Sequence, residues 1–405
     1  MKHVAPQNIL ESVLRANPKC ELVLFDRLPA EQREILKDLL KDPEFYGILR
    51  PLETSSMGAK AVSRDTALLY LTLQQPGRLP DYVRATLGEQ CQMQIVRLVL
   101  DGVLAVEQGG KFLSGSEAAD LIYGSSGELP IAAEAKRFLE RLSLDALRYG
   151  QSLRLADPMA LSARLYGYNR TPLSPHWRRT LPSSDAVMEY LGIRNGRNRQ
   201  LLDREWLKIV NPPTNDGWFA WQARRFDTRA AFVDRTKVPC KLYISPRTEY
   251  LPEVFPVILA VLSKANVVHF KVGKDAPGLL RPDKIVAYCS CYEDLISAAE
   301  QLKRELEGCG AQGVPFTAEL ACDGLLSWGV DPPAEDRVLP WLGRESWRLW
   351  VANRLAVALI EANSDDAVSL EPWKFALRRL QVEGVDTCFW TPAGTDWKHS
   401  LGREN

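Results

Sequence analysis

The sequence predicts an α+β fold, because short strands and amphipathic helices are mixed along the chain without a regular βαβ order. The first 120 residues contain short apolar segments, three helical patterns and a final strand–turn–strand. Residues 239–363 contain further short strands separated by helices, and the helix predicted at 293–306 has its apolar residues on one face. No internal repeat of fixed period is present, which excludes a solenoid.

The composition is that of an ordinary globular protein. The chain has 405 residues, and 51 lysines and arginines balance 51 acids. The 46% of hydrophobic residues excludes a disordered chain, and the charge balance excludes a general binder of nucleic acid. The length suggests two or three domains. No apolar run approaches the roughly 20 residues of a membrane helix, and no secretory leader is visible. We therefore expect a cytoplasmic protein without a membrane partner.

Metal and nucleotide cofactors are not expected. Eight cysteines are too sparse for a disulfide framework, and the four histidines are widely separated. Cys289 and Cys291 form a lone C-x-C, which alternation explains as two residues on one face of a strand. The chain has no P-loop, no dinucleotide fingerprint, no hydrolase elbow and no kinase motif. We predict no cofactor and no metal.

The order of elements in the first 120 residues is typical of a winged helix. An early helix precedes a hairpin, three helices follow it, and a second hairpin forms the wing. The predicted elements are a helix at 28–40, strands at 45–49 and 59–62, helices from Arg64, after Pro80 and at 92–100, and strands at 103–107 and 111–113.

Two further segments flank the α+β region of residues 239–363. Residues 121–238 form a connecting segment with a predicted helix at 132–148, and residues 364–405 form a C-terminal extension. Between Arg164 and Lys208, nine lysines and arginines stand against four acids, with aromatic residues interleaved. This stretch is either a groove for an anionic or extended polymer or a loop-rich packing segment with solvated arginines.

The region 239–363 has the most regular pattern. A loop is expected at 273–278 between the second and third strands. The predicted strands are 241–245, 267–272, 284–288, 317–320 and 325–328, and the predicted helices are 252–262, 293–306 and 344–360.

A polar, mainly cationic group is predicted on this sheet. Alternate residues of a strand share a face, so Lys241 and Tyr243 point the same way, as do His269 and Lys271. If the two strands are neighbours, all four side chains meet over an apolar surface. Such a group suits an anion such as phosphate, and a lysine held among cations can act as a base. The alternative is that the lysines simply face solvent.

Three more cations can join this group. Arg281 and Lys284 lie at the start of the third strand, and Arg348 lies on a later helix that can reach the same cleft. Guanidinium groups bind phosphate oxygens in pairs, which makes these residues candidates for phosphate binding.

The same residues resemble a known family. Lys241–Ser245, followed by a helix and Phe270-Lys271-Val272, resembles the core of bacterial phosphothreonine lyases and, more closely, the HopA-type effector family, whose relatives occur in the biosynthesis of ribosomal peptides (RiPPs). Arg281–Tyr288 is similar to that family's Arg-x-Asp-x-x-Val-x-Tyr strand. Val314–Thr317 and Trp328–Pro332 resemble its later signatures. The resemblance covers residues 239–360.

The resemblance implies β-elimination of phosphate from phosphoserine or phosphothreonine. Lys271 would remove the Cα proton, while Lys241, Arg281 and Arg348 would hold the phosphate and the enolate. The lyases have a histidine where this chain has Tyr243, so the general acid is either Tyr243 or His269. A phenol is a weak acid at neutral pH unless the nearby cations lower its pKa.

The N-terminal part resembles the precursor-peptide recognition element of RiPP biosynthesis. The resemblance rests on the hairpin, on Arg64–Ala67 opening a helix, and on Leu98–Leu104 leading into the wing. Such elements hold a leader peptide as an added strand. A winged helix can also bind DNA, but the third helix, at 92–100, carries only Arg97 as a cation, which argues against a nucleic-acid partner.

Two functions follow from these resemblances. One is a lyase that captures a precursor peptide and eliminates phosphate that a separate kinase has added. The other is a non-catalytic protein that binds the precursor and presents it to a partner enzyme, as in crocagin-type pathways. A secreted effector acting on host proteins is a third option, against which the recognition element argues.

Overall fold

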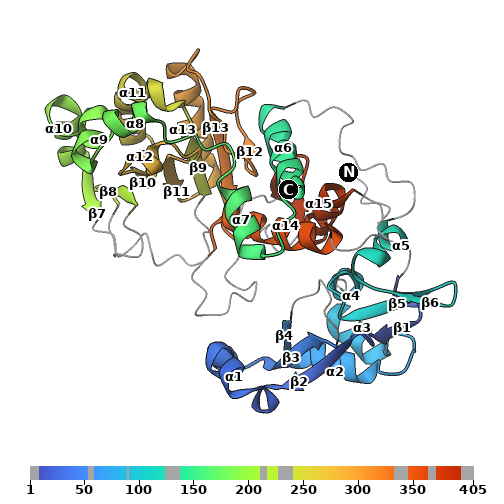
Figure 1. Cartoon of the computed structure of the whole chain (residues 1–405). Coiled ribbons are helices and arrows are strands. Elements are labelled where there is room, and N and C mark those ends of the chain that lie inside the picture. Colours follow the sequence, from blue (N-terminus) through green and yellow to red (C-terminus); the bar gives the residue numbers. More distant parts are fainter. Residues whose placement is uncertain are drawn as a thin grey trace.

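The computed structural model describes residues 9–52, 59–88, 91–123, 137–209, 217–226, 240–332, 345–363 and 371–393. Its helices and small antiparallel sheets confirm the α+β prediction. In Figure 1 the N-terminal elements, coloured blue to cyan, lie apart from the large sheet, and helices α6, α14 and α15 lie between them. Among these described residues, no helix combines the length and the apolar character of a membrane span.

Two three-stranded antiparallel sheets form the N-terminal part, in the strand orders β2-β3-β4 and β1-β5-β6. Both predicted hairpins are present as β3–β4 and β5–β6. The helices predicted from Arg64, after Pro80 and at 92–100 are α2, α3 and α4. The bounds are β1 Leu14–Ala16, β2 Cys20–Leu24, β3 Phe45–Pro51, β4 Lys60–Ser63, β5 Leu104–Gln108, β6 Lys111–Leu113, α2 Arg64–Thr72, α3 Asp81–Leu87, α4 Cys91–Leu100 and α5 Ala119–Tyr123.

The helix predicted at 28–40 is wrong in its extent. The structure has a shorter helix, α1 (Ala30–Leu36), followed by a 3-10 turn at Lys37–Lys41. Leu28 is extended because it precedes Pro29, whose ring disfavours the helical conformation of the residue before it. The predicted apolar face does not bury as a unit, since Ile35 is 73% exposed while Leu39 is buried.

The segment 121–238 contributes to two parts of the structure. Its helices are α6 (Phe138–Ser152), α7 (Pro158–Tyr166), α8 (Pro175–Thr180), α9 (Ser184–Tyr190) and α10 (Gly196–Glu205). The helix predicted at 132–148 therefore begins at Phe138, and positions 132–136 lie outside the described residues. Strands β7 (Trp206–Ile209) and β8 (Trp218–Ala223) from this segment join the large sheet, so that sheet begins before residue 239.

The large sheet has seven antiparallel strands in the order β12-β13-β9-β11-β10-β8-β7. Leu242, Ile244 and Ala287 belong to the main apolar core together with residues of α11 and α13, while Tyr243 and Val286 pack in a separate small cluster. The sheet thus has one apolar face and one polar face. The bounds are β9 Cys240–Ile244, β10 Val267–Gly273, β11 Ile285–Cys289, β12 Ala318–Glu319, β13 Leu326–Val330, α11 Leu251–Lys264 and α13 Tyr292–Glu305.

The loop predicted at 273–278 contains the start of a short helix, α12 (Ala276–Leu279). The side chain of Asp275 caps this helix by accepting from the Gly278 amide at 2.6 Å. The C-terminal elements are α14 (Trp347–Asn363), α15 (Pro372–Val382), β14 (Val385–Asp386) and β15 (Thr391–Pro392).

The first turn of α14 packs on the polar face through Trp347, whose indole donates to the Phe316 carbonyl at 2.8 Å. Gly329 of β13 leaves the space for this ring, since a Cβ there would lie 2.7 Å from its Cδ1 atom. We expect Gly329→Ala to lower the free energy of unfolding by about 1–3 kcal/mol through overpacking, measured by urea denaturation. Gly217→Ala is the control, because a Cβ there has nothing within 4 Å. Equal effects of the two substitutions would contradict this account of the packing.

Candidate functional site

The polar face brings the four strand residues predicted from alternation to one region, although their strands are not neighbours. Strand β11 lies between β9 and β10, and its Tyr288 is in register with Lys241 on one side and His269 on the other. The His269 and Tyr288 rings are stacked at 3.8 Å, and the Lys241 Nζ lies 5.4 Å from the Tyr288 ring. An aromatic ring thus occupies the centre of the predicted group.

Lys271 lies beside this centre without an acidic partner. Its Nζ is 4.4 Å from the Trp218 ring and 5.7 Å from the Tyr288 ring. Within the described parts of the chain its ammonium makes neither a hydrogen bond nor an ion pair. Burial, assisted by the charge of Lys241, lowers the pKa of Lys271 to about 8. A substantial fraction of this side chain is therefore neutral slightly above neutral pH.

Lys241 is paired with Asp331, which follows β13. The two side chains are 2.5 Å apart, and Asp331 also accepts from the Trp347 amide at 2.9 Å. One carboxylate therefore orients the lysine and holds the start of α14 against the sheet.

Arg281 and Arg348 share one buried carboxylate, that of Asp283. Arg281 donates to both Asp283 oxygens at 2.8 and 2.9 Å, and the Arg348 Nη1 forms an ion pair with the Oδ2 atom at 2.8 Å. The Tyr166 hydroxyl at the end of α7 donates to the same Oδ2 at 3.1 Å. Although burial alone would raise the pKa of Asp283, the two guanidiniums hold it well below its usual range. Asp283 is thus ionised.

Lys284 is not brought to this group. It is fully buried, and its ammonium donates to the Pro246 carbonyl at 2.7 Å and to the Gln312 side-chain oxygen. Burial lowers its pKa to about 7. These bonds join the start of β11 to the loops at Pro246 and Gln312, so the position that sequence suggested for phosphate binding carries packing contacts instead.

Neither candidate for the general acid is a strong proton donor at neutral pH. Burial raises the pKa of Tyr243 well above 10, and Asp331 adds to this effect. Burial and the charges of Lys271 and Lys241 lower the pKa of His269 to about 4, so it is neutral at pH 7. The nearby cations therefore do not activate the phenol. Its hydroxyl has no hydrogen-bond partner in the described parts of the chain and stays protonated.

The assembled group is suited to an anion. Lys241, Lys271, Arg281 and Arg348 supply four cations, against the two carboxylates of Asp283 and Asp331. The excess of positive charge at a partly buried surface favours a ligand with two negative charges. Among the residues that the structure describes, no cluster of His, Cys, Asp and Glu has an arrangement that fits a metal ion.

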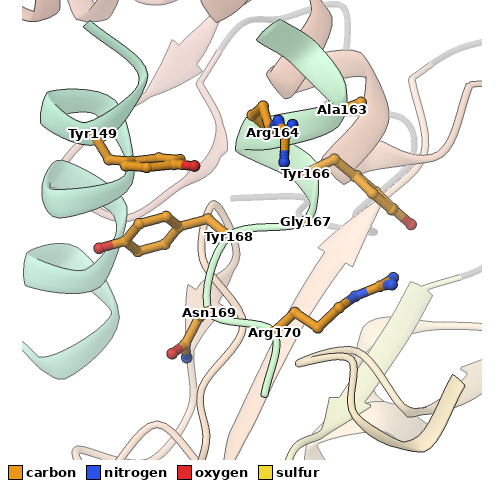
Figure 2. Close-up of a pocket in the computed structure, with 8 residues that line it drawn as sticks. All are labelled: Tyr149, Ala163, Arg164, Tyr166, Gly167, Tyr168, Asn169 and Arg170. Atoms are coloured by element: carbon orange, nitrogen blue, oxygen red, sulfur yellow. The ribbon is translucent and has the colours of Figure 1, made fainter. Parts of the chain in front are cut away.

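A hollow of about 470 Å³ lies next to this group, between α6 and the end of α7. Figure 2 shows the residues that line it, including Tyr149, Arg164, Tyr168 and Arg170. Its lining meets the cationic group only at Tyr166, and the strand residues Lys241, Tyr243, His269 and Lys271 do not line it. The hollow and the cationic group are thus adjacent but separate features.

Sequence reasoning missed several residues of the site. Asp331 and Tyr166 come from a loop and a helix end whose contacts depend on tertiary packing. Tyr288 had a local signal, since it alternates with Val286 along the strand predicted at 284–288. Asp283 also had one, because it stands two residues after Arg281.

Comparisons with known proteins add little to this description. No protein-family model and no curated protein matches the sequence. Among solved structures the chain is similar to two effector proteins of Pseudomonas syringae, from pathovar tomato strain DC3000 and pathovar syringae strain 61. Each has a TM-score of 0.38 and 13% sequence identity, and the similarity covers 64% of this chain and 99% or 100% of the other. At this TM-score the similarity is distant.

We expect Asp283→Asn to unfold the protein more readily, because it leaves the buried guanidinium of Arg348 and the partly buried one of Arg281 without a carboxylate. The expected loss is about 3–5 kcal/mol in the free energy of unfolding, measured with urea at pH 7. Asp203→Asn removes an exposed carboxylate that pairs with Arg199 and should cost less than about 1 kcal/mol. A similar small loss for both variants would refute the structural role of Asp283.

We expect Lys271→Met to stabilise the protein at neutral pH by roughly 1–2 kcal/mol, because the charged lysine is partly desolvated there. Its pKa in the folded protein, about 8, lies below its ordinary value of 10.5. The unfolded chain therefore binds more protons between these values, and the penalty disappears as the pH rises through that window. Urea denaturation from pH 7 to 10 measures the trend, with the exposed Lys264→Met as control. A gain that does not shrink with rising pH would contradict the assignment.

Proposed function

We propose that the protein acts in RiPP biosynthesis as a lyase that eliminates phosphate from a phosphorylated Ser or Thr of a precursor peptide. The observation that supports it most directly is the state of Lys271. Its amine has a pKa of about 8 and no acidic partner among the described residues, and it lies beside an excess of cations. A base of this strength near a phosphate-binding group suits removal of a Cα proton.

The proposed reaction breaks two bonds of the substrate residue. The neutral Lys271 amine takes the Cα proton, the C–H electrons form the Cα=Cβ double bond, and the Cβ–O bond breaks. The phosphate leaves with the electron pair of that bond. Lys241, Arg281 and Arg348 would stabilise the negative charge on the enolate and the phosphate, an effect worth about 3–4 kcal/mol for each well-placed donor. The product is a dehydroamino acid.

Tyr243 and His269 would take supporting roles. Because the pKa of Tyr243 is raised, its phenol stays protonated and can donate a hydrogen bond to the leaving phosphate. His269 is neutral and stacked on Tyr288, so it would shape the site rather than deliver a proton. In this scheme the cations, more than an acid, would support the departure of phosphate.

The N-terminal part would hold the leader of the peptide. The exposed side chains of Leu68 and Leu71 on α2 provide apolar surface beside the β2-β3-β4 sheet. Binding of DNA is disfavoured, because Arg97 of α4 donates to the Val382 carbonyl of α15 at 3.0 and 3.2 Å. The phosphate would come from a separate kinase, since the chain has no kinase motif.

The alternative is a non-catalytic protein that binds the precursor and presents it to a partner enzyme. The observation that favours it is the lack of a strong acid, because the protonated phenol of Tyr243 has a raised pKa and His269 is neutral at pH 7. Both proposals need the same anion-binding face, and they differ only in whether the bound phosphopeptide is converted to a product.

Incubation with a phosphoserine form of a precursor peptide, followed by mass spectrometry, tests the lyase. We expect loss of phosphoric acid from the peptide, at a rate that rises with pH up to about 8 and then levels as Lys271 becomes neutral. Lys271→Ala should abolish the loss. Lys264→Ala, an exposed lysine on α11, should leave it intact.

Other outcomes separate the alternatives. Tight binding of the phosphopeptide without any change of mass, unaffected by Lys271→Ala, would refute the lyase proposal. It would support a non-catalytic protein that presents the precursor to a partner enzyme. Equal affinity for precursors with and without the leader would refute peptide recognition by the N-terminal part.

A further inference from the structure

We propose that the hollow between α6 and the end of α7 binds an acidic side chain of the peptide, a few residues from the phosphorylated one. This inference rests on the proposed function, and it adds a determinant of which peptides are chosen. Three features support it: the shape of the hollow, its unpaired cations and its position next to the cationic group, which it meets at Tyr166.

The hollow carries cations that lack acidic partners. Arg164 and Arg170 are both exposed, and in the described parts of the chain neither guanidinium makes an ion pair or a hydrogen bond. The neighbouring arginines differ, since Arg148 pairs with Asp145 at 3.6 Å and Arg281 is held by Asp283. Although Arg170 is exposed, partial desolvation of its guanidinium and repulsion from Arg281 lower its pKa, while Asp283 and Asp275 act in the opposite direction. A carboxylate is the group that would relieve this uncompensated charge.

The aromatic lining favours an amino acid with an aliphatic stem. The rings of Tyr149 and Tyr168 lie 5.4 Å apart at one end of the hollow. In Figure 2, Tyr166 and Arg170 extend toward the other end, and Arg164 lies between. A glutamate can pack its methylene groups on the tyrosine rings while its carboxylate meets the arginines.

The loop that forms the hollow is fixed before any ligand arrives. Asn169 has a φ of 64°, and its side chain donates to the carbonyls of Gln312 and Gly313 at 2.6 and 3.0 Å. Gln312 in turn donates to the Asn169 carbonyl at 2.6 Å. Arg170 follows directly on this clamped residue. A preformed site loses little entropy on binding, which favours a role in recognition.

The hollow lies within reach of a peptide that occupies the cationic group. The Lys271 Nζ is 4.4 Å from the Trp218 ring, which is 4.8 Å from the Arg281 guanidinium, and that group is 5.5 Å from the Tyr166 ring. An extended chain covers this path in about four or five residues at roughly 3.3 Å each. The acidic residue therefore belongs to the same short peptide segment as the phosphorylated one.

Sets of four fluorescein-labelled peptides, one set for each position of the acidic residue, test the inference with the full-length protein. They carry serine or phosphoserine at the centre and glutamate or glutamine at one position, which is varied about two to six residues to either side. Fluorescence anisotropy at low salt gives each Kd. At the peptide position whose side chain reaches the hollow, we expect the glutamate peptide to bind about five- to tenfold more tightly than the glutamine peptide. Arg164→Gln or Arg170→Gln should bring this ratio to about one.

Arg194→Gln is the matched control, because this exposed arginine lies on the far segment after α9 and pairs with Asp185 and Glu189. It should leave the glutamate-to-glutamine ratio intact. Equal Kd values for glutamate and glutamine at every position would overturn the inference, whatever the phosphate result. Equal Kd values for serine and phosphoserine would instead overturn the proposed function. The ratio of the Kd values of the glutamine and glutamate peptides would still show whether the hollow binds an acidic side chain.

Discussion

The carboxylate of Asp283 is the contact on which the polar face depends. It joins Arg281 of the preceding turn, Arg348 of α14 and Tyr166 of α7, three elements that are far apart in the sequence. Taking one carboxylate and two guanidiniums out of water is costly, and only their close mutual contacts compensate for it. Because two cations share one acid, the group keeps a positive charge after its internal pairing. The same contact therefore fixes the architecture and leaves an attraction for anions.

The features of the polar face that could be predicted from the sequence are those that depend on residues close together in the chain. Alternation along a strand is local, so the sequence placed Lys241 with Tyr243 and His269 with Lys271 correctly. The order of the strands is not local, and the insertion of β11 between β9 and β10 could not be read from spacing. The pairing of Lys241 with Asp331 depends on the packing of α14 and was also beyond reach.

Lys284 shows how a correct periodicity can still mislead. Its position has the same parity as Val286 and Tyr288, which face the polar side. The strand begins only at Ile285, however, so the backbone before it is free to turn the lysine toward Pro246 and Gln312. At the end of a strand, the direction of a side chain depends more on its own hydrogen bonds than on the alternation of the pleated strand. The short helix α12 escaped prediction for a similar reason, because its start depends on a local hydrogen bond to the side chain of Asp275.

The membership of β7 and β8 in the large sheet has a consequence for how the chain can be divided. Strand β10 is protected by β11 on one side and by β8 on the other. A fragment that began at residue 239 would keep β11 but lose β8, and the backbone donors and acceptors of β10 would become an open edge. Such edges recruit strands from other molecules. The segment that supplies β8 thus covers the edge of β10 and protects it from aggregation, and it belongs to the folding unit of the sheet.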